Sequence, residues 1–309
     1  MIKISEDFAS FPAEHANRHK LGKDGGRESL AHMIMLPEYG IAGWMYPTIT
    51  WDGEAKGAAC LFGPALDELI AEKSEGRVAD DMDFYDFRIG GFNMAIRAPH
   101  KKVDLGWRGE RLSMDLRYEA LHPAYSFSTR QPGIPDFFGN DRTEQHGTLK
   151  GTIVVDGKTY AVNSMMVRDH SWGARIWKLN QHYKWFHAVT EDICVHVFEL
   201  QFYGRIHQQG FLFKDGLMRQ IVAVEHDYSF DSNMMHQAIQ MRVKDSEGRQ
   251  VTIDSKTFAV LPVDYDPVVV LHEAAQSCTI EGKTGVGWCS FCWNRDYLAH
   301  AKEYVQQYG

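Results

Sequence analysis

The stretch Ile153-Val-Val-Asp-Gly-Lys-Thr-Tyr160 decides the fold class of this 309-residue chain. Two β-forming runs flank Asp156-Gly157, and Asp-Gly between such runs is a strong hairpin signal because both turn positions favour positive φ. The same pattern returns further along the chain, at Asp215-Gly216, Ser246-Glu247-Gly248 and Glu281-Gly282. The second half of the chain is therefore predicted to be an antiparallel meander.

The first half is also rich in β-forming runs. Residues 112–119 alternate apolar with polar side chains, as a half-buried strand does. Residues 83–97 and 103–107 predict two further strands, and residues 64–73 predict a short helix. A second helix is predicted over residues 296–307, where apolar side chains recur at helical spacing. We expect that helix to cover an open edge or end of a barrel.

A change of pattern between His122 and Asp141 suggests a division of the chain. This segment contains three of the ten prolines and shows no alternation. It could be a linker or a loop folded over a pocket. We place the boundary there, which gives two β domains, residues 1–135 and 136–309.

Charge and cysteine usage exclude several classes of protein. The net charge is −8, from 33 basic and 41 acidic residues, which is unfavourable for binding nucleic acid or an anionic membrane. No apolar run reaches the length of a membrane span, and the first twenty residues lack a signal-peptide core. The five cysteines are an odd number and scattered, as reduced thiols are. We expect a cytoplasmic monomer or homodimer without membrane insertion.

The densest group of unusual residues is Val167-Arg-Asp-His-Ser-Trp-Gly-Ala-Arg175, which follows a predicted strand. A surface loop has no packing requirement for an acid, a histidine, an indole and two guanidinium groups. One interpretation is a structural corner in which Asp169 pairs with an arginine and Trp172 plugs a barrel end. The other is a contribution to an active site.

The next predicted hairpin joins residues 183–189 to residues 193–203. With a three-residue loop, its register places a set of polar and aromatic side chains on one face: Tyr183, Trp185, His187, Glu199 and Gln201. An apolar and aromatic wall with a few polar groups is typical of a small-molecule pocket. A carboxylate midway along an apolar strand must be paired or have a shifted pKa, and a raised pKa would suit Glu199 to acid–base work.

Motifs for phosphate binding, for an α/β-hydrolase nucleophile and for a metal are not found in the sequence. The glycines at positions 22, 25 and 26 have no strand–turn–helix context, and no GxSxG occurs. The histidines on the predicted strands form no HxH or HxxxH pair: His170, His182, His187, His196 and His207. The sequence therefore predicts neither a cofactor nor a metal.

Arg168-Asp-His-Ser-Trp-Gly173, followed by Arg175, resembles a signature of the lipocalin-like superfamily that includes carotenoid 1,2-hydratase and kievitone hydratase. The chain resembles more closely a bacterial branch of this superfamily that carries an RDHSWGxR motif. The flanking segments are also similar: Arg27-Glu-Ser-Leu30, Gly40-Ile-Ala-Gly-Trp44, Glu144-Gln-His-Gly147, Gly151–Gly157 and Gly285-Val-Gly-Trp288. The resemblance spans nearly the whole chain. Ser171 stands where the carotenoid enzymes have Asn, and Cys289 where an acid is common.

This resemblance implies two lipocalin-like antiparallel β-barrels with a pocket at or near their interface. It implies cofactor-free chemistry on hydrophobic natural products, in which an alkene is protonated or hydrated or a cyclisation is guided. His170 and Trp172 match the family's HxW motif. Glu199, with Tyr183 or Tyr203, is the candidate for the later acid and aromatic residue.

Our first hypothesis is a cofactor-independent lyase or isomerase acting on a terpenoid-, steroid- or polyketide-like molecule. Glu199 or the Asp169/His170 pair would transfer the proton, and Trp172 and Trp185 would stabilise a developing cation. The remaining predicted substrate-binding residues are Arg175, Tyr183, His187 and Tyr203. The second hypothesis is a non-catalytic carrier of hydrophobic ligands. The third, a metal-dependent oxygenase, requires three ligands that converge on one point.

Overall fold

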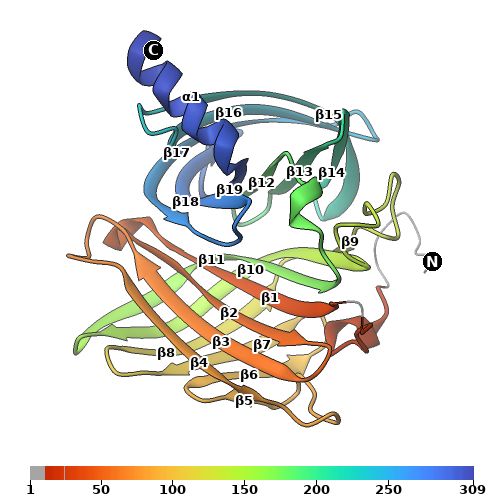
Figure 1. The fold of residues 1–309 in the computed structure, drawn as a ribbon, viewed down its shortest axis with the longest axis vertical. Helices are drawn as coiled ribbons and strands as arrows, with labels where there is room; N and C mark the ends of the chain where they lie inside the picture. The colour runs from red at the N-terminus through yellow and green to blue at the C-terminus, as the bar shows by residue number, and fades with distance from the viewer. Residues whose placement is uncertain (1–10, 24) are drawn as a thin grey trace. The chain divides into compact units, whose positions relative to one another are not determined.

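The structure, a computed structural model, describes residues 11–23 and 25–309 and is built almost wholly of β-strands. The chain divides into two compact units (Figure 1): residues up to Leu36 together with Ile41–Arg175, and Pro37–Gly40 together with Ile176–Gly309. The division after Arg175 differs from the expected boundary at residue 135. The expectation of no leader peptide concerns in part residues 1–10, which lie outside the described residues.

The first unit is an eleven-stranded antiparallel sheet in the order β4-β3-β2-β1-β11-β10-β8-β7-β6-β5, with β9 paired to β10. Its strands are β1 (Arg27–Leu36), β2 (Ile41–Thr50), β3 (Glu54–Phe62), β4 (Ile70–Arg77), β5 (Phe87–Ile89), β6 (Phe92–Ala98), β7 (Lys102–Arg108), β8 (Leu112–Ala120), β9 (Tyr125–Ser126), β10 (Asp141–Val155) and β11 (Lys158–Gly173). Strands β10 and β11 lie between β8 and β1. The two strands therefore belong to this sheet, and the segment that was expected to separate two domains lies inside the first unit.

The sheet curls until side chains from its two ends meet. Trp107 on β7 donates its indole N–H to Glu72 Oε2 on β4 at 2.5 Å, and the amide of Gly91 donates to Ser74 Oγ at 3.0 Å. The concave side is lined by large apolar side chains of β6, β7 and β8 that are almost fully buried: Phe92, Trp107, Met114 and Tyr118. The first unit thus has one interior.

The second unit is a closed barrel of eight strands in sequential order, with β12 paired to β19. They are β12 (His182–Val189), β13 (Cys194–Phe202), β14 (Arg205–Lys214), β15 (Leu217–Phe230), β16 (His236–Asp245), β17 (Gln250–Val263), β18 (Val269–Ile280) and β19 (Lys283–Asn294). Helix α1 (Arg295–Tyr308) follows, with Asn294 accepting from the amides of Asp296 and Tyr297. Leu298 anchors the helix in the barrel core.

Local chemistry predicted the turns and the last helix correctly. Asp156 and Gly157 have φ of 47° and 80°, and two of the other three predicted turns also have two positive φ values: Asp215-Gly216 and Glu281-Gly282. In Ser246-Glu247-Gly248, only Gly248 has a positive φ. The all-β class is confirmed. The helix predicted at residues 64–73 is wrong, because Ile70–Arg77 is strand β4 and pairs with β3.

Two further expectations can be compared with the described residues. All five cysteines are buried and free, as expected for reduced thiols. Among the described residues, no helix has both the length and the hydropathy needed to cross a membrane.

Two glycines of the β10–β11 hairpin provide a test of the register. Gly151 has φ +145°, and an added Cβ would lie 1.9 Å from the carbonyl oxygen of Asp115 on β8; Gly157 has φ +80° and nothing within 4 Å of an added Cβ. We expect Gly157→Ala to cost about 1 kcal/mol of backbone strain, and Gly151→Ala to cost at least ~3 kcal/mol because β8 must move. Urea unfolding measures both, and equal costs would contradict the β8–β10 pairing.

Candidate active site

Burial changes abruptly along β11. Its residues from Lys158 to Met165 include exposed positions, whereas every residue from Met166 to Gly173 is buried. The paired part of β10, Asp141–Gly147, is buried throughout, and so is β1 from Glu28 onward. The Arg168–Gly173 signature therefore lies within a strand that is covered on both faces, and not in a loop after a strand as expected.

Strand alternation divides the signature between two faces. Arg168, His170 and Trp172 share the parity of Met166 and point to the concave interior of the first unit, whereas Asp169 and Ser171 point to the opposite side. The ladder supports this assignment, because His170 lies opposite Leu30 on β1 and Thr143 on β10. Asp169 and His170 are therefore neighbours in sequence whose side chains diverge.

The interior face carries a buried carboxylate beside His170. Glu28 on β1 lies opposite Trp172, and its Oε1 is 2.7 Å from His170 Nε2. Glu28 is fully buried, and His170 is 1% exposed. The pairing of β1 with β11 thus joins two polar groups that are 142 residues apart in the chain.

His19 completes this cluster from the segment that precedes β1. Its Nδ1 lies 2.7 Å from Glu28 Oε1, and its backbone amide donates to Glu28 Oε2 at 3.0 Å. The imidazole stacks on Trp172 with ring centroids 3.6 Å apart and planes 9° from parallel. His15 Nδ1 lies 3.0 Å from His19 Nε2, which extends the chain of hydrogen bonds to a partly exposed ring.

Several polar contacts hold the 11–23 segment on this end of the first unit. Arg18 donates to the carbonyls of Ala79 and Met82, and Asn17 Oδ1 accepts from the amide of Phe84. Phe84 in turn presents an edge to the His170 ring, with centroids 5.8 Å apart. The segment therefore positions His19 and covers His170.

The hydrogen bonds determine the protonation of the cluster. Burial opposes ionisation of Glu28, but bonds from His170 and His19 outweigh it and lower the pKa of this carboxyl. Burial lowers the pKa of His170, although Glu28 opposes that shift. Because its pKa is lowered, the His170 ring is neutral. Since a carboxylate only accepts hydrogen bonds, the ring proton is assigned to Nε2. Its buried Nδ1 then carries a lone pair, and no described group hydrogen-bonds to it.

The same three side chains meet the geometric requirement for a metal site. His19, Glu28 and His170 each offer one ligand atom, and these atoms lie within 4.8 Å of one another. Two histidines and one carboxylate suit Fe²⁺ and related ions. They come from three separate segments, so a search for paired histidines on one element could not find them. In this structure, Nδ1 of His19 and Nε2 of His170 both contact Glu28 Oε1, as hydrogen-bond donors do.

Asp169, predicted as catalytic, forms a buried ion pair on the opposite face. It contacts Arg142 Nη2 on β10, and the same nitrogen lies 2.8 Å from Glu144 Oε1. Arg175, predicted to bind substrate, stacks on Phe138 at 4.0 Å and donates to its carbonyl oxygen. These contacts agree with the structural-corner interpretation, one of the two that the sequence left open for this segment.

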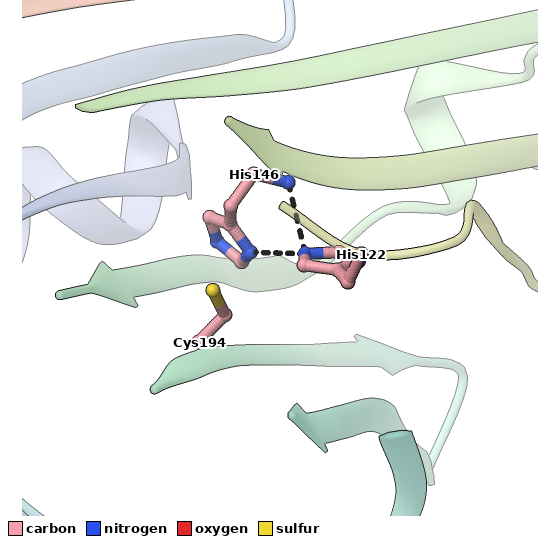
Figure 2. Close-up of side chains that lie close together, drawn as sticks. All are labelled: His122, His146 and Cys194. Carbon is pink, nitrogen blue, oxygen red and sulfur yellow. Dashed lines mark hydrogen bonds between the residues drawn. The ribbon is translucent and has the colours of Figure 1, made fainter. Parts of the chain in front are cut away.

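A histidine pair at the same outer face, His122 and His146, forms hydrogen bonds within the pair and with the adjacent backbone. His122 Nε2 lies 3.0 Å from both the backbone nitrogen and Nδ1 of His146, and Figure 2 shows these two contacts as dashed lines. The other ring nitrogen of His122 lies 2.8 Å from the carbonyl oxygen of Pro123. Burial lowers the pKa of His122 to about 4, so the ring is neutral and fixes the 122–123 segment against β10.

The predicted apolar and aromatic wall on strands β12 and β13 is wrong, because the observed register of these strands differs by one residue from the predicted one. His187 pairs with His196 and Lys184 with Glu199, because four residues and not three separate β12 from β13. Tyr183, Trp185 and His187 therefore lie on the face opposite to Glu199. A shift of one residue moves every side chain of a strand to the other face.

Glu199 is an ion-paired carboxylate and not a proton donor with a raised pKa. Hydrogen bonds from His226 and Lys184 lower the pKa of Glu199 to about 2 despite burial. Its Oε1 lies 2.5 Å from Lys184 Nζ, and Oε2 lies 3.4 Å from His226 Nε2. Tyr203, predicted to bind substrate, is 61% exposed in the turn between β13 and β14.

Glu28 and His19 were missed by the sequence reasoning. A signal for Glu28 was present, because Glu28 and His32 are the polar members of one face of an otherwise apolar strand, where a buried charge requires a partner. No periodic pattern marks His19, whose position depends on how the irregular 11–23 segment folds back.

Comparison with solved structures shows the fold. The chain is similar to CghA solved with Sch210972 (10% identity, TM-score 0.63, 88% of this chain and 89% of that chain covered). It is also similar to kievitone hydratase from Nectria haematococca (10%, 0.57, 89% and 91%) and to an AttH-like protein from Nitrosomonas europaea (14%, 0.60, 86% and 92%). The fold relationship inferred from the signature is therefore confirmed.

A comparison of the sequence with curated proteins found no match. A family model described as "Domain of unknown function (DUF7064)" matches residues 12–295. That range covers most of both units, from the histidine-bearing segment to the start of α1.

The Glu199 ion pair predicts a specific acid sensitivity. Because the folded-state pKa of Glu199 is about 2 and the ordinary value is 4.5, its contribution is fully present above pH ~4.5 and is lost as the pH falls towards 2. We expect Glu199→Gln to cost on the order of 3 kcal/mol at pH 7, and this difference from wild type to shrink below pH 4.5. Urea unfolding between pH 7 and 3 measures it. A pH-independent difference would contradict the ion pair.

Proposed function

The chain belongs to the DUF7064 family, and we propose that it is a lyase or isomerase that transfers a proton on an apolar small molecule. His170 acts as the general base through Nδ1, and Glu28 orients its ring. The observation that carries this proposal is the 2.7 Å contact of His170 Nε2 with a carboxylate, opposite a buried Nδ1 to which no described group hydrogen-bonds.

The dyad has the geometry expected of a base and its orienting acid. Glu28 fixes the tautomer and stabilises the imidazolium that forms when Nδ1 takes a proton. The His19–His15 hydrogen bonds connect Glu28 to the partly exposed end of the cluster. These hydrogen bonds provide a route by which the charge that forms on the His170–Glu28 pair can be shared with His19 and His15.

The surroundings of His170 favour an apolar substrate. The interior face of the first unit also carries apolar side chains that are almost fully buried: Leu30, which lies opposite His170, together with Met45 and Leu149. Trp172 and Phe84 border the imidazole. Few polar groups in apolar surroundings are typical of sites for hydrophobic small molecules. The similarity to kievitone hydratase also supports lyase chemistry.

The proposal predicts a loss of proton transfer without loss of fold. We expect His170→Gln to slow the exchange of α-protons for deuterium in apolar cyclic ketones and enones, such as 2-tetralone and carvone, by roughly 10²–10⁴-fold. Glu28→Gln should slow it by at least ~10²-fold through the wrong tautomer. The measurement is ¹H NMR of the ketones in D₂O, with circular dichroism to verify folding.

Asp169→Asn is the matched variant on the other face of the same strand. It breaks a buried ion pair, so we expect lower stability and exchange within about threefold of wild type per folded molecule. Exchange that depends on Asp169 and not on His170 would contradict the assignment. Histidine ¹⁵N NMR provides a substrate-free check, because Nδ1 of His170 must give an unprotonated resonance that changes in Glu28→Gln. A carrier would retain ligand binding and show no exchange in any variant.

A metal enzyme is the second candidate, because His19, Glu28 and His170 lie close enough to share one ion. The proton-transfer proposal predicts that dialysis against EDTA leaves exchange unchanged. It also predicts that added Fe²⁺, Mn²⁺ or Zn²⁺ does not stimulate it. Loss of exchange on dialysis, with recovery on adding one ion, would replace the general base by a metal centre.

A further inference from the structure

Arg168 lies two residues before His170 and shares its face of β11. Its side chain is 3% exposed, at the interior of the first unit. Nη1 donates to Gln145 Oε1 at 3.3 Å, whereas Nε and Nη2 are buried and have no hydrogen-bond partner among the described residues. A guanidinium group that offers five N–H donors thus makes one long hydrogen bond.

A buried cation with so few partners is unfavourable for folding alone. Burial lowers the pKa of Arg168, and the phenol of Tyr118 and the carboxylate of Asp169 only partly oppose that shift. Asp169, however, is on the other face and contacts Arg142. The neighbouring polar group on β1 is His32, which lies opposite Arg168 in the ladder, and its pKa is lowered mainly by burial and also by this cation. Neither neighbour accepts the free N–H groups of Arg168.

This arrangement differs from that of the other buried arginine on these strands. Arg142 has two carboxylates, Glu144 and Asp169, next to Nη2. The same sheet therefore pairs one buried guanidinium twice and leaves two donor nitrogens of the other unpaired. An unpaired charge in the interior strongly destabilises the folded protein unless an anion meets it.

We propose that Arg168 binds an oxygen of the substrate that becomes an enolate, so that the substrate class is an apolar, enolisable carbonyl compound. This inference rests on the proposed function, because it supplies the acceptor side of the proton transfer at His170. The N–H donors of Nε and Nη2 would hold the carbonyl oxygen, and Nδ1 of His170 would face the adjacent C–H bond.

Strand geometry matches this pair of roles. Residues i and i+2 of a strand lie about 6.6 Å apart and project from the same face. A C–C=O unit with a hydrogen-bonded oxygen at one end and a base at the other spans a similar length, with contacts of about 3 Å at each end. The two groups therefore suit the two ends of one enolisable unit.

The chemical step balances with the groups present. The α-proton moves to His170 Nδ1, the C–H electron pair forms the C=C bond of the enolate, and the carbonyl π pair becomes a lone pair on the enolate oxygen held by Arg168. Return of the proton to the γ-carbon of an enone system shifts the double bond. Departure of a β-hydroxyl, protonated to water by the same imidazolium, completes a dehydration.

The test is binding of an enolate against a neutral ketone. The probes are 5-phenylcyclohexane-1,3-dione, which is largely enolate at neutral pH, and 3-phenylcyclohexanone, each titrated calorimetrically. We expect wild type to bind the dione at least tenfold more tightly and Arg168→Met to lose that preference. Arg117→Met, on the exposed side of β8, should retain it. A wild type without the preference, or an Arg168→Met variant that keeps it, would overturn the inference.

A measurement on the wild-type protein protects the test against a variant that does not fold. In ¹⁵N-arginine-labelled protein, the Nε resonance of Arg168 should shift on adding the dione and not on adding the ketone, and no shift with the dione overturns the inference. The two proposals fail separately. Enolate preference without α-proton exchange would leave a binding protein, whereas exchange that needs His170 without enolate preference would remove only the role of Arg168.

Discussion

The pairing of β1 with β11 is the constraint on which the candidate site depends. It brings Glu28 against His170 across 142 residues of sequence, inside the first unit where neither group can be hydrated. An ionised carboxylate in such a place requires strong donors. Two imidazole nitrogens and the His19 amide supply them, so the site and the closure of this end of the sheet form together.

The two faces of β11 use buried charge in opposite ways. On the outer face, Asp169 neutralises Arg142 directly, and the pair fixes β10 against β11. On the inner face, the charges are separated: Glu28 bonds to the imidazoles of His170 and His19, and Arg168 reaches only an amide oxygen. Complete pairing serves stability, whereas incomplete pairing is tolerated where a ligand completes it.

The sequence predicted whatever depends on local chemistry. Acid–glycine turns determined the hairpins, because the required positive φ is a property of a few adjacent residues. The C-terminal helix followed from its spacing and is capped by Asn294. His170 and Trp172 could be selected from one segment, since their chemical density is visible without any partner.

The rest depended on distances that are not encoded locally. The loop between Val189 and Cys194 is one residue longer than expected, and that difference alone removed Glu199 from the face of Tyr183 and His187. Glu28 could be suspected as a charge in an apolar strand, but its partner was determined by the order of strands in the sheet. His19 belongs to an irregular segment, whose path follows from contacts such as those of Arg18 with the 79–82 turn.

The spacing of the Arg168–Gly173 signature follows from two requirements: the inner face of β11 carries the candidate site, and the outer face holds the strand in the sheet. A strand covered on both faces can give alternate residues to different tasks, so an Arg-x-His-x-Trp series on one face can coexist with an Asp-x-Ser series on the other. Trp172 closes the series by stacking on His19, which holds the second imidazole against Glu28. The outer residues fix β11 between β1 and β10, and the inner residues are thereby held without relying on loop conformation. A loop carrying the same residues would supply the chemistry without this rigidity, which is why the strand location supports function more strongly than the composition of the motif.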